Sequence, residues 1–313
     1  MLVAQIQKRQ SRWNPKGKEP QLSPRHIEAF KLLTRYTYLT RLHFQAFLGG
    51  DTSSWQEALR NLTAAGYLER PKQQRQHYNA NYRPLVYSLG NRGLYALQER
   101  GVDALKPRAH RNFAHELMTS ELMASFELGA REMRVRLVTW PEILASQSLP
   151  EATKRAPKPY TIPLRYDGED HQITADGQPF GIAWPNDKGT VFYFCAGIEA
   201  DCATEPLETS DFERSSIYKK FTLYLEIEKH QLYRSHFGFP NMLVPFITTN
   251  RVRLESMKRV LERVTNGKGS KSILFGAPYP AFTSFEKPLP PSGFALTNNY
   301  ERVGFPPFSF LTA

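Results

Sequence analysis

Three carboxylates in the second half of the sequence have a spacing that suits a divalent metal ion. Asp176 lies in the stretch A-D-G, and Glu199 and Asp201 lie in G-I-E-A-D, directly after the apolar run V-F-Y-F-C-A. Side chains two positions apart on a strand point to one face, so we expect Glu199 and Asp201 to share a face. Carboxylate oxygens suit Mg²⁺, which can neutralise charge on a phosphodiester and activate a water molecule. The pattern is compatible with a metal site in which Asp176 and Glu199 are the ligands; the alternative is a structural or inherited remnant of such a site.

The order of these residues resembles that of the PD-(D/E)xK nuclease family. In that family the Asp and the Glu bind the metal, and a lysine two residues after the Glu orients the attacking water. Here Asp176 follows alanine rather than proline, Glu199 matches the Glu, and Asp201 takes the lysine position. The resemblance implies Asp176, Glu199 and Asp201 as the catalytic set. A carboxylate cannot stabilise developing negative charge, so the exchange favours a non-catalytic site unless Lys219 or Lys220 supplies the cation.

A mixed sheet must position these carboxylates. Strands are expected in V-R-L-V-T-W, on both sides of the turn at Asp167-Gly168, and in V-F-Y-F-C-A-G-I-E, M-L-V-P-F-I-T-T and S-I-L-F. Helices are expected from about Phe113, at 218–230 and at 253–264, whereas the proline-rich residues 146–163 predict a loop. Strands that alternate with helices after an initial meander predict a mixed sheet covered on both faces.

The first third of the sequence predicts a winged helix-turn-helix. Helix 23–35 opens with Ser23-Pro24, Thr40 caps a second helix, and Ser53 or Ser54 caps a third. A hairpin with a long basic tip follows Gly66, and residues 93–101 predict a closing helix. In this arrangement the third helix enters the major groove and the hairpin tip, or wing, lies along the DNA backbone.

The predicted DNA-binding residues belong to the third helix and to the wing. When Trp55, Leu59 and Leu62 turn inward, the third helix exposes a polar face. Gln and Asn can pair with adenine and Arg with guanine, whereas cations of the wing would contact phosphates. The candidates are Ser54, Gln56, Arg60 and Asn61 in the helix and Arg70, Lys72, Arg75, His77 and Arg83 in the wing. The alternative for both groups is an ordinary solvated surface.

The overall charge also suits a nucleic-acid partner. The sequence has 41 Lys and Arg against 30 Asp and Glu, a net charge of +11. No apolar run approaches the roughly 18 residues of a spanning helix, so we expect a cytoplasmic protein without a membrane partner. The two cysteines, Cys195 and Cys202, form no C-x-x-C motif that would bind zinc.

Both halves together resemble the replication-relaxation family of plasmids and conjugative elements. The matching stretches are L-S-P-R-H-I-E-A-F-K-L-L-T, L-T-R-L-H-F-Q, A-A-G-Y-L-E-R, V-Y-S-L-G-N-R-G, His115, A-D-G, I-E-A-D and K-K-F-T-L-Y, over about residues 22–265. The resemblance implies a role in plasmid replication, DNA relaxation or mobilisation. It places residues 52–65 in the recognition helix and the three carboxylates in the acidic constellation.

The expected fold class is therefore α/β, or α+β overall, with an N-terminal winged helix-turn-helix and a mixed-sheet, restriction-endonuclease-like domain. The expected divisions are a basic, disordered arm at 1–21, the DNA-binding domain at 22–108, the nuclease-like domain at 109–277 and a Pro/Phe-rich tail at 278–313 that wraps the surface.

The favoured function is a double-stranded DNA-binding accessory factor that requires no cofactor. The alternatives are a Mg²⁺-dependent endonuclease or nickase and a winged-helix transcriptional regulator. Expected partners are double-stranded DNA, a relaxase or other mobilisation protein, and a second copy of the chain.

Overall fold

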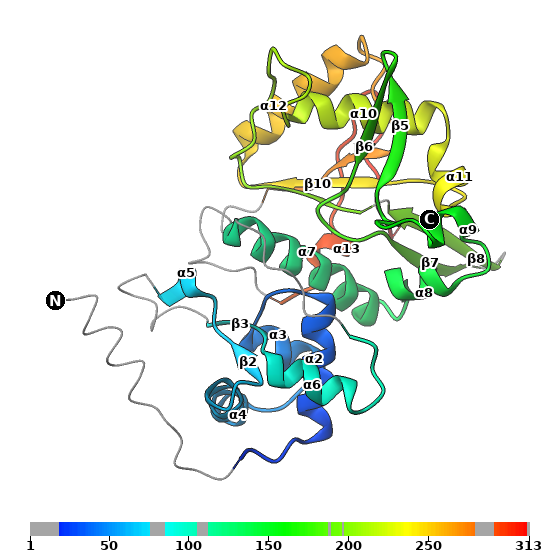
Figure 1. The fold of residues 1–313 in the computed structure, drawn as a ribbon. Coiled ribbons are helices and arrows are strands. Elements are labelled where there is room, and N and C mark those ends of the chain that lie inside the picture. Colours follow the sequence, from blue (N-terminus) through cyan, green and yellow to red (C-terminus); the bar gives the residue numbers. More distant parts are fainter. Residues whose placement is uncertain are drawn as a thin grey trace. The chain divides into compact units, whose positions relative to one another are not determined.

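The computed structural model describes residues 19–75, 85–104, 112–186, 189–195, 197–278 and 291–311. These residues form a mixed α/β structure with 12 helices and several small sheets (Figure 1). The chain divides into two compact units. The first comprises Met1–Glu121 and Phe285–Pro291, and the second comprises Leu122–Ser284 and Ser292–Ala313, so the division falls inside helix α7 (Phe113–Glu132).

The first unit combines short helices with one antiparallel sheet. Its strands pair in the order β1-β3-β2, with Leu39 opposite Tyr87 and Leu68 opposite Leu89. In chain order the elements before α7 are α2 (Pro24–Arg35), β1 (Leu39–Thr40), α3 (Arg41–Leu48), α4 (Thr52–Ala64), β2 (Leu68–Glu69), α5 (Lys72–Arg75), β3 (Val86–Leu89) and α6 (Asn91–Gln98).

Two of the three predicted helix caps are correct. Ser23 is the N-cap of α2 and its hydroxyl accepts a hydrogen bond from the backbone N–H of His26, and Thr40 is the N-cap residue of α3. The prediction of Ser53 or Ser54 for α4 is wrong. The N-cap is Asp51, whose carboxylate accepts the backbone N–H of Ser54 at 2.8 Å. An ionised carboxylate at a helix N-terminus also interacts favourably with the helix dipole.

The inner face of α4 is fixed by aromatic packing. The Trp55 ring stacks on Phe44 of α3 with 5.5 Å between ring centroids, and its indole N–H donates to the carbonyl of Gly49 at 2.7 Å. Leu59 and Leu62 are fully buried on the same face. The opposite face of α4 is thereby turned toward solvent, as the spacing of these three residues predicted.

The second unit is built around two small sheets that one bridge joins. Strands β4, β7 and β8 pair antiparallel, β9, β10 and β11 pair parallel, and Cys195 at the end of β8 bridges to Leu243 beside β10. Its elements after α7 are β4 (Arg136–Val138), α8 (Trp140–Ala145), α9 (Glu151–Lys154), β5 (Ile162–Tyr166), β6 (Glu169–Ile173), β7 (Phe180–Asn186), β8 (Gly189–Cys195), β9 (Glu199–Asp201), α10 (Ile217–Lys229), α11 (Leu232–Phe237), β10 (Val244–Thr248), α12 (Arg251–Val264), β11 (Ile273–Phe275) and α13 (Phe294–Thr297).

Helices cover both the antiparallel and the parallel sheet. Helices α10 and α12 run side by side over one side of β10 (Figure 1). On α7, the Phe126 ring lies 4.8 Å from the ring of Phe180 on β7. Strands β5 and β6 form a separate hairpin, and its turn is the predicted Asp167-Gly168, where both residues have positive φ angles of 51° and 80°. Positive φ at both central residues is typical of a tight hairpin turn.

Several predicted elements differ from those found. The run V-F-Y-F-C-A-G-I-E is not one strand, because β8 ends at Cys195 and Glu199 begins the separate strand β9. Gly197 has a φ of 139°, and a Cβ there would lie 2.3 Å from the carbonyl oxygen of Gly177. Glycine thus permits the segment around Gly177 to approach the break between the two strands. Strand β7 and helix α11 were not predicted, and helix α9 lies within the predicted loop 146–163.

Residues 291–311 are part of the core of the second unit rather than a surface wrap. Tyr300 and Phe310 are fully buried, and the Phe310 ring contacts Phe126 and Tyr193. The hydroxyl of Ser125 donates to the carbonyl of Ser292 at 2.6 Å. The apolar character of this segment therefore reflects packing against α7 and β8.

Candidate functional site

The break between β8 and β9 brings Asp176 beside Glu199, as the sequence pattern proposed. The backbone N–H of Gly177 donates to the carbonyl of Ile198 at 3.1 Å, and the backbone N–H of Ala200 donates to Asp176 Oδ2 at 2.9 Å. Asp176 is therefore held by the backbone of the strand that carries Glu199. The close approach depends on the glycines at 177 and 197, which follow Asp176 and precede Glu199 in the sequence.

A lysine from α10 lies among the carboxylates. Lys220 Nζ is 2.6 Å from Glu199 Oε2, 3.2 Å from Glu205 Oε2 and 3.8 Å from Asp176 Oδ2. Its side chain is only 20 % exposed. Lys219, the other lysine considered as a source of the cation, points elsewhere: its Nζ lies 5.0 Å from the ring centroid of Phe212. Of the two, Lys220 supplies the cation at this site.

Glu199 is the most deeply buried member of the cluster. Its side chain is 1 % exposed, and Tyr224 Oη of α10 donates to Glu199 Oε1 at 2.5 Å while Lys220 binds the other oxygen. Burial raises the pKa of Glu199 to about 8, although the Lys220 charge opposes the shift. The surrounding carboxylates outweigh the effect of burial on Lys220 and raise the pKa of its ammonium group. The lysine is therefore charged.

Asp201 has a different set of partners from Glu199. Arg253 of α12 donates from Nε to Asp201 Oδ2 at 2.8 Å and from Nη2 to Oδ1 at 3.0 Å, and Thr248 Oγ1 donates to Oδ2 at 2.6 Å. The Asp201 side chain is 4 % exposed. A two-point ion pair with arginine already satisfies this carboxylate. We assign Asp201 to holding β9, β10 and α12 together rather than to binding a metal.

Glu205 is the member of the cluster that sequence reasoning missed. It lies in the segment between β9 and α10, and its backbone carbonyl accepts a hydrogen bond from Arg253 Nη2 at 2.6 Å. The same arginine thus fixes both Asp201 and the backbone that carries Glu205. Only the stretch E-A-D-C-A-T-E signals it in the sequence, and no regular element there predicts where its side chain points.

The donor set fits a hard divalent cation. Three carboxylate oxygens, from Asp176, Glu199 and Glu205, lie around the single ammonium of Lys220 at 2.6–3.8 Å. Even with Glu199 protonated below about pH 8, the two other carboxyl groups outnumber the single ammonium. Oxygen-only ligands of this kind suit Mg²⁺ or Mn²⁺ better than softer metals. Asp176, Glu199 and Glu205 are the residues that would hold such an ion. Their oxygens surround Lys220 rather than meet at metal-ligand spacing, so Lys220 would have to move aside and the carboxylates would have to draw together.

Three of the four predicted base-reading residues of the first unit are exposed. Ser54, Gln56 and Arg60 of α4 are exposed, and Asn61 is half-buried. In the predicted wing, Lys72 of α5 is exposed and Arg70 is half-buried. Arg75 is the last residue of α5, whereas His77 and Arg83 lie outside the described residues. The short helix α5 occupies part of what the sequence predicted as a hairpin tip.

A comparison with known protein families identifies the chain. The model of the replication-relaxation family matches residues 25–242, which is more than half of the sequence. The protein therefore belongs to the replication-relaxation family. No curated protein and no solved structure matches the chain. Among the helices that the structure describes, none combines the length and apolar character that a bilayer crossing requires.

Proposed function

We propose that this protein processes plasmid DNA by binding a double-stranded site through its first unit and cleaving a phosphodiester bond at the carboxylate cluster of its second. The family, named for replication and relaxation, supports a role in DNA processing. The observation that carries the proposal of cleavage is Lys220 among Asp176, Glu199 and Glu205. The absence of a lysine at position 201 was the reason to favour a non-catalytic site, and Lys220 removes that reason.

The proposed winged helix-turn-helix is supported by the order of elements in the first unit. The elements follow one another as α2, β1, α3, α4, β2, α5 and β3, with the short helix α5 between the last two strands and β3 in the middle of the sheet. In this arrangement α4 would be the helix that enters the major groove. Its exposed Gln56 and Arg60 have the side chains that pair with adenine and guanine.

The proposed chemistry divides between the carboxylates and the lysine. Asp176, Glu199 and Glu205 would hold a divalent ion, which supplies charge neutralisation of the phosphate and a more acidic bound water. Lys220, on the first half of α10, orients the attacking water and stabilises negative charge that develops on the phosphate oxygens. Tyr224 keeps the Glu199 carboxylate in position through its hydrogen bond to Oε1.

A second candidate function is DNA binding without cleavage, and one observation favours it. Both oxygens of Glu199 already have hydrogen-bond donors, Lys220 and Tyr224. The ammonium group itself neutralises part of the charge that a metal would neutralise. In an accessory factor this cluster would be a buried ion-pair network that joins α10 to β9.

Cleavage of supercoiled plasmid that carries candidate origin DNA separates the two functions. The protein is incubated with Mg²⁺ or Mn²⁺ and with chelator, and nicked plasmid is quantified. We expect metal-dependent nicking that Asp176→Asn and Lys220→Met reduce by about 100-fold or more. DNA retardation should be unchanged in both variants, since neither residue belongs to the first unit.

Lys219→Met is the matched control. It removes the neighbouring lysine of α10, which contacts Phe212 and Glu213 instead of the cluster, so nicking should persist. Retarded but uncut DNA under every condition would leave the accessory role as the function. Equal nicking by the wild type and the Asp176 variant would instead show that the activity comes from a contaminant.

A further inference from the structure

A second group of metal-ligating side chains lies away from the carboxylate cluster. Glu169 and His171 are two positions apart on β6, and Glu213 comes from the segment that precedes α10. One ligand atom from each of the three residues lies within 4.8 Å of the others. Among the described residues no other such group contains three His, Cys, Asp or Glu side chains at this spacing.

The histidine ring of this group is held by aromatic neighbours. The ring centroid of His171 lies 5.4 Å from that of Phe212 and 6.3 Å from that of Tyr166, and the rings of Phe212 and Tyr166 stack at 5.3 Å. Ring packing limits the rotation of the imidazole, as the support around a metal-binding histidine commonly does. The position of His171 is therefore set without any help from a ligand.

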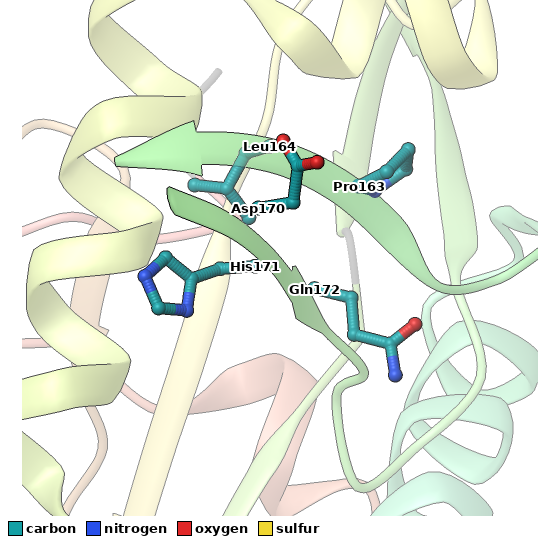
Figure 2. Close-up of a pocket in the computed structure, with 5 residues that line it drawn as sticks. All are labelled: Pro163, Leu164, Asp170, His171 and Gln172. Atoms are coloured by element: carbon teal, nitrogen blue, oxygen red, sulfur yellow. The ribbon is translucent and has the colours of Figure 1, made fainter. Parts of the chain in front are cut away.

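One of the three side chains also borders a hollow in the surface. The hollow, on the β5–β6 hairpin, is lined by Pro163, Leu164, Asp170, His171 and Gln172, so of the three proposed ligands His171 alone borders it (Figure 2). In Figure 2 the His171 and Gln172 side chains point in opposite directions, as neighbours on a strand do. Glu169 is therefore on the His171 side of β6. Its side chain and that of Glu213 are exposed, so an ion can enter from solvent with water as a further ligand.

We propose that Glu169, His171 and Glu213 bind a divalent transition metal ion of the zinc type. One imidazole and two carboxylates are a ligand set that such ions accept, with water in the remaining position. This set differs from the oxygen-only cluster around Lys220, so the two sites would take different metals. Lys219 Nζ lies 4.0 Å from Glu213 Oε1, at the outer limit of an ion pair.

A metal at this position would fasten the segment 202–216 to the β5–β6 hairpin. That segment carries Glu213 at one end and Glu205 of the carboxylate cluster at the other. The carbonyl of Glu213 is 3.4 Å from Lys219 Nζ of α10. The ion would thereby limit the motion of the chain that presents Glu205, without touching the cluster itself.

Zinc binding to the full chain tests the proposal directly. Protein stripped with chelator is dialysed against ZnCl₂, and bound zinc is counted in the wild type, His171→Ala and Glu213→Gln. We expect the wild type to bind one more zinc ion than either variant, or each variant to bind at least about tenfold more weakly. Both substitutions are at incompletely buried positions, and circular dichroism checks that the variants fold.

A matched control separates this site from surface histidines in general. His230→Ala removes an exposed histidine that contacts a single carboxylate, Glu226, at 3.1 Å. It should bind zinc as the wild type does, and so should Asp176→Asn, since the carboxylate cluster is elsewhere. Zinc binding that His171→Ala leaves unchanged, or that His230→Ala abolishes, overturns the proposal.

Limited proteolysis gives a second measurement that does not depend on DNA cleavage. Trypsin can cut after Arg214, inside the segment that the ion would fasten. Zinc should slow this cut in the wild type and leave the rate unchanged in His171→Ala. Equal rates with and without zinc in the wild type, measured by mass spectrometry of the fragments, contradict the proposed role of the ion.

Discussion

At the residue scale, Lys219 and Lys220 show how strongly one helical step separates two identical side chains. Successive residues on an α-helix point about 100° apart. Lys220 therefore reaches Glu199 at 2.6 Å, whereas Lys219 lies over the ring of Phe212. A sequence can offer both lysines of K-K-F-T-L-Y as candidates. The choice between them depends on how α10 is rotated about its axis against β9. The local sequence pattern does not predict that rotation.

Asp201 shows a local rule that is correct and a partner that the rule does not predict. It lies two residues after Glu199 on a strand, and both carboxylates point toward the helices that cover β9. The distant Arg253 decides their different roles, since it binds Asp201 with two hydrogen bonds. Strand alternation predicts a shared face but cannot predict which helix supplies a partner.

The raised pKa of Glu199 predicts a pH-dependent stability. Its pKa rises from 4.5 to about 8 on folding. The folded state therefore keeps a proton that the unfolded state has lost. The free energy of unfolding should fall between about pH 5 and about pH 8, by up to ~1.4 kcal/mol per pH unit from this group.

Urea unfolding in chelator across that range measures the effect. Glu199→Gln has no proton to release at this position, so its free energy of unfolding should lack this fall with pH. Mg²⁺ at about pH 8 should raise the free energy of unfolding of the wild type alone and so make its fall smaller. The same slope in both proteins would mean that Glu199 is already ionised at low pH.

The Asp201–Arg253 pair predicts a loss of stability rather than of metal binding. Arg253→Met leaves the buried Asp201 carboxylate without its main partner and should lower the free energy of unfolding by about 3 kcal/mol. Arg259→Met on the same helix removes an exposed arginine and should change it by about 0.5 kcal/mol or less. Urea unfolding of both variants gives the comparison, and similar losses would contradict the assigned role of Asp201.

At the element scale, α4 is where sequence reasoning succeeded most. Trp55, Leu59 and Leu62 recur at helical spacing, and all three are buried. The error at its start, Ser53 or Ser54 in place of Asp51, has a simple origin. Serine and aspartate both cap helices well, and contacts such as that of Trp55 with Gly49 fix the first turn.

Strands were harder to predict than helices. Strand β7 reads F-G-I-A-W-P-N, and its glycine, proline and lack of alternation conceal it. It pairs with β8 over seven residues, so its stability comes from distant partners rather than from its own sequence. The break at Gly197 was missed for the same reason, because only the neighbouring segment at Gly177 makes it necessary.

Two substitutions in the first unit test the proposed DNA-binding role of α4 and α5. Gln56→Ala on α4 should lower the preference for the correct site by about 1–3 kcal/mol and leave non-specific binding unchanged. Lys72→Ala on α5 should weaken binding to every sequence alike and reduce the slope of log affinity against log salt by about 1. Retardation assays over a salt series give both quantities. If Gln56→Ala weakened binding to every sequence alike and Lys72→Ala lowered the preference for the correct site, α4 would not be the helix that enters the major groove.

At the scale of the whole molecule, the sequence already indicated the family and the class of fold. The net charge of +11 and the stretches spread from residue 22 to 265 indicated a DNA-processing protein, and the family model matches residues 25–242. The sequence did not reveal the path of the chain after that match. Residues 291–311 return to α7 and β8, because their aromatic side chains complete a core that earlier segments leave open.

This return has a consequence for the timing of synthesis. Glu199, Glu205 and Lys220 leave the ribosome well before Phe310, yet Phe310 packs against Tyr193 of β8, the strand that precedes β9 in the chain. A nascent chain thus holds every residue of the carboxylate cluster while the packing of β8 is still incomplete. The cluster should therefore reach its final geometry only after Phe310 has left the ribosome.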